Sequence, residues 1–254
     1  MSKETRYYSD FSDDFSETKT QDFKIRDDYK WVRNSFFAKL FSGVVYAAAI
    51  AFGCVFCPLV LRMKSPHGAS KMRKTKEGFF IYGNHTQPVG DVVIPALCAF
   101  PKRIYTVVSQ ANYGIPVIGR LLPYLGALPI SDTFEGMREF NRAVEYRLSQ
   151  KRPIVIYPEA HVWEYYTGIR PFPDTSFKFP VYHEKPSYAM TATYRKTRFF
   201  KRPVMNVYID GPFFPHGKNK REKAENLKND IYGAMLKRSK LSDCEYIAYR
   251  KKDE

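Results

Sequence analysis

An uninterrupted apolar stretch, residues 40–61, limits what this chain can fold into. The stretch reads LFSGVVYAAAIAFGCVFCPLVL and holds 22 residues without a charged side chain. A helix of that length extends about 33 Å, close to the hydrocarbon thickness of a bilayer. We expect the segment to contact a membrane, either as a span or as a helix, or a hairpin broken near Pro58, within one leaflet. A buried core helix is the alternative, although core helices rarely need so many uncharged residues.

The residues on either side of this stretch indicate an orientation. Lys39 precedes it, whereas Arg62 and Lys64 follow it closely and more lysines come shortly after. Positive charge is denser on the cytoplasmic side of membrane segments. We therefore expect membrane localisation with the folded domain on the cytoplasmic side. The stretch begins too late in the chain to be a signal peptide.

The formal net charge of +15 favours anionic partners. Such a charge attracts nucleic acid, anionic lipid, acidic carrier proteins or phosphorylated cofactors. The apolar stretch argues against nucleic acid, as does the lack of a helix-turn-helix, zinc or RNP pattern. Cys54 and Cys57 lie inside the apolar stretch, where we interpret them as small packing residues.

The chain divides by composition into three parts: a polar N-terminal tail (1–34), a hydrophobic membrane segment (35–63) and an α/β domain (64–254). We expect the tail to be flexible or interfacial, with a short surface helix possible only over 23–31. Apolar runs predict strands at 78–84, 103–109, 153–159, 188–195, 204–210 and 245–250. Helices are predicted over 135–148 and 219–239. The alternation predicts a mostly parallel central sheet flanked by helices.

One loop of this domain carries residues suited to acid–base chemistry. The tract from Gly83 to Asp91 follows a predicted strand and precedes a helix expected near Val92. Open α/β sheets place their sites in such loops. The imidazole of His85 can accept a proton from an alcohol, and Asp91 can orient the ring. Residues six apart do not share a helix face, so this pair requires a turn through the intervening proline and glycine.

Three tracts of the sequence resemble conserved blocks of the glycerolipid acyltransferases, the family of 1-acyl-glycerol-3-phosphate acyltransferases. NHTQPVGD resembles the family's Asn-His-x4-Asp block, with one more intervening residue. IVIYPEAHVWEYYTGIRPF resembles the block built on Phe-Pro-Glu-Gly-Thr-Arg, and YLGALPISD more weakly resembles the block between them. The resemblance implies a glycerol-3-phosphate acyltransferase-like fold for the domain.

The resemblance also implies a reaction and a set of site residues. His85 would act as general base and Asp91 would orient it, without a covalent acyl-enzyme. Asn84, Glu159 and His161 would contact the substrate. The donor would be acyl-CoA or an acyl carrier protein, used as a co-substrate with no other cofactor. The acceptor would be a lysophospholipid within the membrane, such as 1-acyl-glycerol-3-phosphate.

The chain departs from the family where the family grips phosphate. The middle block ends in Ser131-Asp132 instead of Arg, and the later block also lacks its Arg. We expect Arg170 or Lys178 to supply the missing charge, unless the acceptor carries no phosphate monoester. A catalytically inactive, membrane-associated lipid-binding protein of the same fold is the alternative. The spacing of the His, Asp and Glu residues matches no familiar metal site, so no metal is expected.

Overall fold

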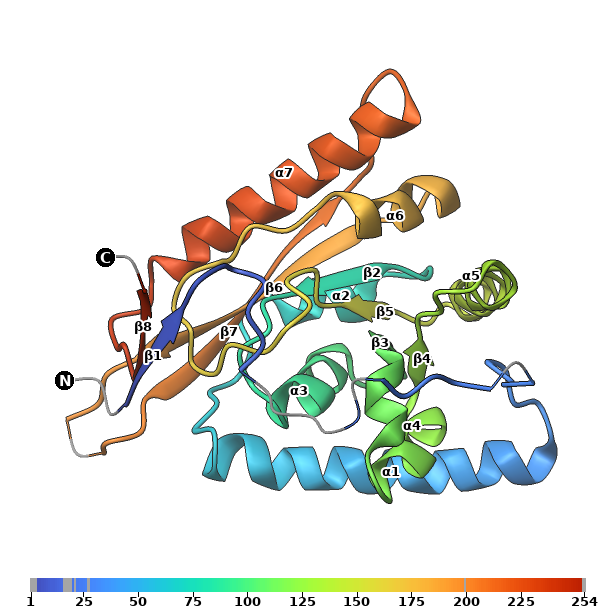
Figure 1. Cartoon of the computed structure of the whole chain (residues 1–254), viewed down its shortest axis with the longest axis horizontal. Helices are drawn as coiled ribbons and strands as arrows, with labels where there is room; N and C mark the ends of the chain where they lie inside the picture. The colour runs from blue at the N-terminus through green and yellow to red at the C-terminus, as the bar shows by residue number, and fades with distance from the viewer. Residues whose placement is uncertain (1–3, 16–19, 21, 27, 199, 253–254) are drawn as a thin grey trace.

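The computed structural model describes residues 4–15, 20, 22–26, 28–198 and 200–252. Its centre is a six-stranded sheet with the order β4-β3-β5-β2-β6-β7 (Figure 1). The strands are β2 (Phe80–Gly83), β3 (Tyr105–Val108), β4 (Ala127–Pro129), β5 (Ile154–Ile156), β6 (Ser187–Arg195) and β7 (Val204–Phe213). Only the pairing of β6 with β7 is antiparallel. The predicted mostly parallel α/β fold is confirmed.

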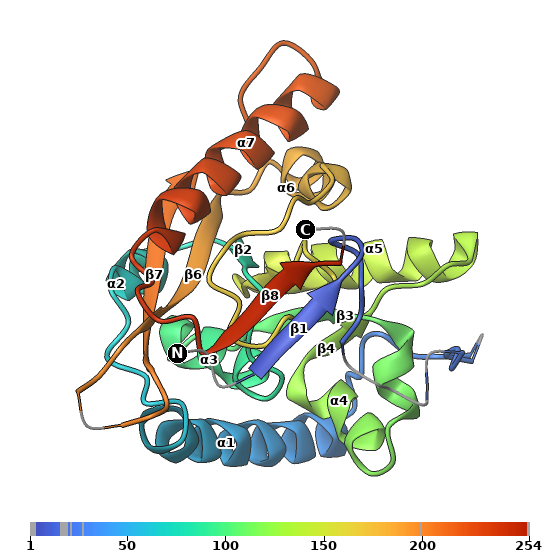
Figure 2. The ribbon, with the colours of Figure 1, turned by 60° about the vertical axis from the view of Figure 1, so that its left-hand side comes forward.

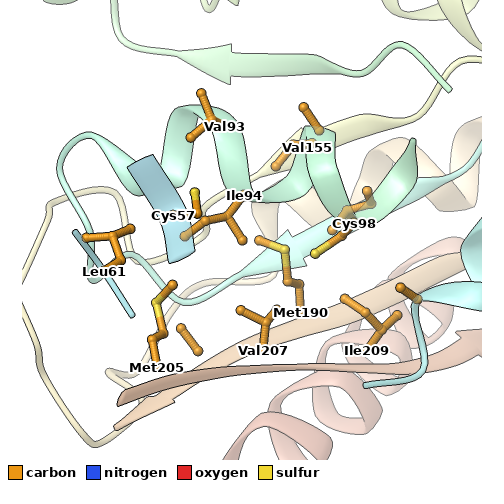
Figure 3. Close-up of a cluster of buried hydrophobic side chains, with 14 of the residues drawn as sticks. Cys57, Leu61, Val93, Ile94, Cys98, Val155, Met190, Met205, Val207 and Ile209 are labelled. Carbon is orange, nitrogen blue, oxygen red and sulfur yellow. The ribbon is translucent and has the colours of Figure 1, made fainter. Parts of the chain in front are cut away.

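Helices cover both faces of the sheet because neighbouring strand residues point to opposite sides. In β2, Ile81 faces the layer of α1 (Phe36–Leu59), α2 (Ala69–Lys74) and α3 (Gly90–Ala99). Figure 3 shows part of this cluster, in which Ile94 and Cys98 of α3 lie above Met190, Val207 and Ile209 of the sheet. Phe80 and Tyr82 face the other layer, made of α5 (Phe134–Ser149), α6 (Lys178–His183) and α7 (Lys220–Ser239). The remaining helix, α4 (Ile118–Leu125), packs on α1.

The two helices predicted in the domain begin at side-chain caps. The hydroxyl of Thr133 accepts a hydrogen bond from the backbone of Gly136 at 3.1 Å, and α5 begins at the next residue. The amide oxygen of Asn219 accepts one from Glu222 at 2.9 Å, where α7 begins. Each cap satisfies a backbone N–H that the first helical turn leaves unpaired.

The apolar stretch forms a single helix, α1, which lies along the domain (Figure 1). It begins at a Ser35 cap, earlier than residue 40, and continues through Pro58. A Cβ atom at Gly53 would lie 3.1 Å from Cβ of Val93, so this glycine allows α1 to approach α3 closely. Most of the helix is exposed, including Phe37 and Val44. In length and composition it could cross a membrane, and no other helix in the described ranges meets that test.

The expectation of a flexible N-terminal tail is wrong for residues 4–15. Residues Glu4–Tyr8 form β1, which pairs in parallel with β8 (Ile247–Lys251). Figure 2 shows this pair as a second small sheet beside the main one. The tail's polar residues gave no apolar period, but backbone pairing with a distant strand does not require one. No helix forms over the described part of 23–31.

Candidate active site

His85 and Asp91 meet at the carboxyl edge of the parallel strands. His85 follows β2, and Asp91 is the second residue of α3. Nδ1 of His85 lies 2.7 Å from Oδ2 of Asp91. The same oxygen accepts backbone hydrogen bonds from Thr86 and Gln87, both at 2.9 Å. The structure therefore accommodates the extra residue in the loop and brings the predicted pair together.

This bond assigns the tautomer of the imidazole. A carboxylate oxygen can only accept, so Nδ1 of His85 carries the hydrogen and donates a hydrogen bond to Asp91. Nε2 is then left as the basic nitrogen. The His85 side chain is 19% exposed, whereas that of Asp91 is 4% exposed. The imidazole is thus partly exposed to solvent, while its carboxylate partner stays inside the protein.

Tyr157, which sequence reasoning gave no role, supports the pair from below. Its ring stacks on the imidazole of His85 with centroids 4.4 Å apart and planes 19° apart. Its hydroxyl donates to the backbone oxygen of Asp91 at 2.7 Å. Burial, and then the charge of Asp91, raise the pKa of Tyr157 well above its ordinary value, so it stays a donor. A Cβ at Gly83 would lie 2.6 Å from this ring, and the glycine leaves room for it.

Asn84, predicted to bind substrate, is instead used inside the protein. Its Nδ2 donates to the backbone oxygen of Ala192 at 3.0 Å, and its Oδ1 accepts from the Ala192 N–H at 2.8 Å. The residue is 3% exposed. Asn84 therefore joins the end of β2 to β6, and its amide has both of its ends bonded to backbone.

Glu159 and Arg170, also predicted to bind substrate, form a buried ion pair. The two side chains are 1% and 0% exposed, and Nη2 lies 3.3 Å from Oε2. Oε2 of Glu159 also accepts from the backbone N–H of His85 at 3.0 Å, and Oε1 accepts from that of Arg170 at 3.0 Å. Burial raises the pKa of the Glu159 carboxyl, and the guanidinium opposes that shift. The pair fastens the His85 loop and is not open to a ligand.

The loop after β5 holds the His85 loop through its backbone as well. The backbone N–H of Trp163 donates to the oxygen of His85 at 3.0 Å, and that of Tyr165 donates to Thr86 at 3.0 Å. The Thr86 hydroxyl lies 2.7 Å from the hydroxyl of Tyr194, which also accepts from Gln87 at 3.0 Å. These contacts form a buried hydrogen-bond network beneath the His85 loop, and no local sequence pattern predicts it.

His161 and Lys178 take different places. The imidazole of His161 is 39% exposed, near the same loop, and its Nδ1 lies 3.3 Å from Oδ2 of Asp14. Lys178 begins α6, directly before β6. Ser187, the first residue of β6, pairs with Phe80, the first residue of β2, so α6 leads into the amino edge of the strands. The structure does not bring Lys178 to the His85 group, contrary to the expectation.

Comparison with known proteins shows a similarity in structure but no match in sequence. No protein-family model matches the sequence, and no curated protein matches it. Among solved structures, the chain is similar to the crystal structure of the 1-acyl-sn-glycerophosphate acyltransferase PlsC of Thermotoga maritima. The two share 13% identity at a TM-score of 0.51, over 79% of this chain and 94% of that one. At this identity the likeness establishes the acyltransferase-like fold.

Proposed function

We propose that this chain transfers an acyl group from a thioester donor to a hydroxyl of a membrane lysophospholipid, with His85 as general base. The observation that carries the proposal is the His85–Asp91 pair, 2.7 Å apart at the carboxyl edge of the sheet. The fold shared with an enzyme described as a 1-acyl-sn-glycerophosphate acyltransferase supports the reaction class. The resemblance of the tract NHTQPVGD to the family's His–Asp block supports the roles of the two residues.

In the proposed reaction, Nε2 of His85 accepts the proton of the acceptor hydroxyl while the hydroxyl oxygen attacks the thioester carbonyl carbon. The carbon–sulfur bond then breaks, and the imidazolium returns the proton to the leaving sulfur. Asp91 stabilises the imidazolium during the interval. Tyr157 and the two backbone bonds of the Asp91 carboxylate keep the ring in this orientation.

The donor is proposed to be acyl-CoA or an acyl carrier protein, since both are anionic and the chain has a net charge of +15. The acceptor headgroup is less constrained. Arg170 is buried against Glu159, and Lys178 lies at the amino edge, so neither supports a contact with a phosphate. The headgroup is therefore the main variable of the experiment.

We further propose that α1 lies in one leaflet instead of crossing the bilayer. The Ser42 hydroxyl donates to the oxygen of Tyr124 in α4 at 2.7 Å and accepts from Arg103 at 2.6 Å. Further along, Gly53 and Cys57 are buried against the domain. A helix attached over this length would draw the polar domain into the hydrocarbon if it spanned. Its exposed apolar face suits the bilayer interface on the proposed cytoplasmic side.

The experiment is a panel of lysolipid acceptors against acyl-CoA and acyl-carrier-protein donors, with the full chain in phospholipid vesicles and products identified by mass. Flotation of the vesicles in high salt tests membrane binding, because nucleic-acid contacts are screened there. No product with any pair of substrates, from protein that floats with the vesicles, would favour the lipid-binding alternative.

The variant that tests the role of His85 is His85→Ala. General base catalysis contributes about a hundredfold to ten-thousandfold, so kcat should fall by that factor. His216→Ala is the matched control, since that imidazole is 59% exposed on a distant loop, and its rate should equal that of the native protein. Asp91→Asn should also slow the reaction, because it removes the charge that stabilises the imidazolium. Equal rates for His85→Ala and the native chain would refute the mechanism.

A further inference from the structure

The N-terminal segment, Glu4–Phe15, precedes the apolar helix in sequence but packs on the catalytic domain. Its strand β1 pairs with β8 from Glu4 opposite Ile247 to Tyr8 opposite Lys251 (Figure 2). Beyond β1 the chain turns, and residues 11–15 reach the loop that follows β5. The segment is separated from the His85 loop by about 70 residues of sequence. It nevertheless contacts the loop after β5, which is bonded to the His85 loop.

Residues 11–15 contact that loop through backbone oxygens, aromatic rings and a carboxylate. The indole N–H of Trp163 donates to the backbone oxygen of Asp13 at 2.8 Å. Nη1 of Arg170 donates to the backbone oxygen of Phe11 at 3.0 Å. The ring of Phe15 meets Trp163 edge-on, with centroids 5.2 Å apart. The ring centroid of Phe11 also lies 6.0 Å from that of Trp163, and Oδ2 of Asp14 lies 3.3 Å from Nδ1 of His161.

The residues contacted by the segment are the ones that fix His85. The backbone oxygen of His85 accepts from the N–H of Trp163, and its backbone N–H donates to Glu159, the partner of Arg170. The backbone oxygen of His85 is therefore bonded to Trp163, which the N-terminal segment contacts directly. The backbone N–H of His85 is bonded to Glu159, whose ion-pair partner Arg170 the segment contacts. Nη2 of Arg170 also donates to the backbone oxygen of His161, which ties the loop to itself.

The contacts of the segment with Trp163 and Arg170 involve buried polar groups. Trp163 and Arg170 are both 0% exposed, so each depends on protein acceptors for its polar hydrogens. Without the segment, the indole N–H and one guanidinium N–H would lose those acceptors, and water would have to enter to replace them. The guanidinium also lies over the Trp163 ring, 4.8 Å from its centroid, so a shift of the indole would move the cation.

We propose that residues Phe11–Phe15 are a positioning element of the active site. They hold Trp163 and Arg170, and through them the main chain of His85, in the geometry that its pairing with Asp91 requires. Phe15 and Asp14 touch no reacting atom in this scheme. The inference rests on the proposed function for its effect on rate, but its effect on the His85 loop is independent of any substrate.

The first test is hydrogen exchange of the His85 backbone amide in the full chain, in detergent micelles or vesicles. Phe15→Ala should speed that exchange at least tenfold and leave the amides of Leu227 and Ile231 in α7 unchanged. Phe15→Tyr, which keeps the aromatic ring, should restore slow exchange. Tyr7→Ala is the matched control, because that side chain is in the same segment but 60% exposed, and it should behave as the native protein.

The second test is the rate of acyl transfer with the acceptor identified by the panel. Phe15→Ala should lower kcat tenfold to a hundredfold with KM for the acceptor within twofold, since it disturbs the base and not the binding surface. Asp14→Ala, which removes a more exposed contact, should lower kcat less. Unchanged exchange and unchanged kcat in Phe15→Ala would overturn the proposal, as would equal effects in Tyr7→Ala.

A third variant covers the case in which Phe15→Ala unfolds the domain and the α7 amides also lose protection. Trp163→Phe keeps a buried aromatic ring but is smaller than the indole, and it removes the N–H that donates to Asp13. It should speed exchange at His85 severalfold with α7 intact, and no change would then overturn the proposal. If the native chain shows no acyl transfer, the proposed function fails, while the exchange measurements still decide whether the segment positions the loop.

Discussion

At the carboxyl edge of the parallel strands, Asp91, Glu159 and Arg170 are nearly inaccessible to solvent. At the amino edge, Lys178, Lys220 and Arg221 are exposed around an open pocket of about 510 Å³. Both edges carry charge, but Asp91, Glu159 and Arg170 at the carboxyl edge each have several protein partners at fixed distances. Exposed cations attract anions over a distance, whereas buried and bonded groups hold a reacting side chain in place.

The number of basic residues in the sequence therefore does not indicate where the site lies. Most of the chain's excess positive charge is free to be solvated, and solvated charges fit a surface for anionic lipid or donor equally well. Few charged groups hold the His85 loop, and Arg170 acts on it through its ion pair with Glu159, which accepts the His85 backbone N–H. Burial of Asp91, Glu159 and Arg170 among several protein partners distinguishes the carboxyl edge from the amino edge, and this difference can be tested.

The largest expected effect is on folding stability. Arg170→Met should lower the free energy of unfolding by about 3–5 kcal/mol, because it leaves the Glu159 carboxylate buried without its counter-ion. Arg221→Met at the amino edge should change it by no more than about 0.5 kcal/mol. Chemical denaturation of both variants in the same detergent checks the difference. Similar losses in the two variants would remove the distinction between the edges.

A smaller effect is expected at Asn84. Asn84→Ala leaves the buried N–H and C=O of Ala192 without the amide that bonds both, which should cost about 1–3 kcal/mol of unfolding free energy. Asn226→Ala is the control near the amino edge, where the side chain donates only to the oxygen of His216 in an exposed contact. It should cost no more than about 0.5 kcal/mol. A neutral Asn84→Ala would mean that the bridge between β2 and β6 contributes little.

The smallest effect concerns an exposed charge at the carboxyl edge. Hydrogen bonds from Lys24 and then Gln110 lower the pKa of the Asp132 carboxyl from its ordinary value of 3.8 to about 2. Because the folded-state pKa is the lower one, the stabilisation is present above pH 4 and is lost as the pH falls toward 2.

Lys24→Ala should therefore raise the pKa of Asp132 toward its ordinary value, as read from the carboxyl carbon signal in an NMR titration. Lys178→Ala, at the opposite edge, should leave that titration where it is. If Lys24→Ala has no effect, the contact between residue 24 and Asp132 does not form in solution, and exposed charges at the two edges behave alike.

Much of the fold follows from the sequence because its strands are apolar and its long helices are capped. The runs near 153–159 and 204–210 predict β5 and β7, and a stripe of small and apolar residues predicts α7. Two strands give no such signal. β4 has three residues, too few for a period, and β1 is largely polar and depends on a partner from the far end of the chain. Pairing over that separation is a property of the tertiary fold.

The site was predictable where it is local. His85 and Asp91 are six residues apart, so one turn decides whether they meet. The roles of Tyr157 and Trp163 depend on how the loop after β5 folds onto the loop after β2, and no spacing reports that. Arg170 illustrates the difficulty: an arginine in a loop is ordinarily exposed, and only the fold shows that a carboxylate, two backbone oxygens and an indole ring enclose it.

Gly83 affects the orientation of His85 through the ring of Tyr157. The aromatic ring of Tyr157 occupies the space in which any other residue would place its first side-chain carbon. A single added methyl group would require that ring to move, and the same ring stacks on the imidazole of His85 and donates through its hydroxyl to the backbone oxygen of Asp91. A side chain at position 83 and the ring of Tyr157 cannot occupy the same space, so the orientation of the His85 imidazole depends on the glycine two residues before it.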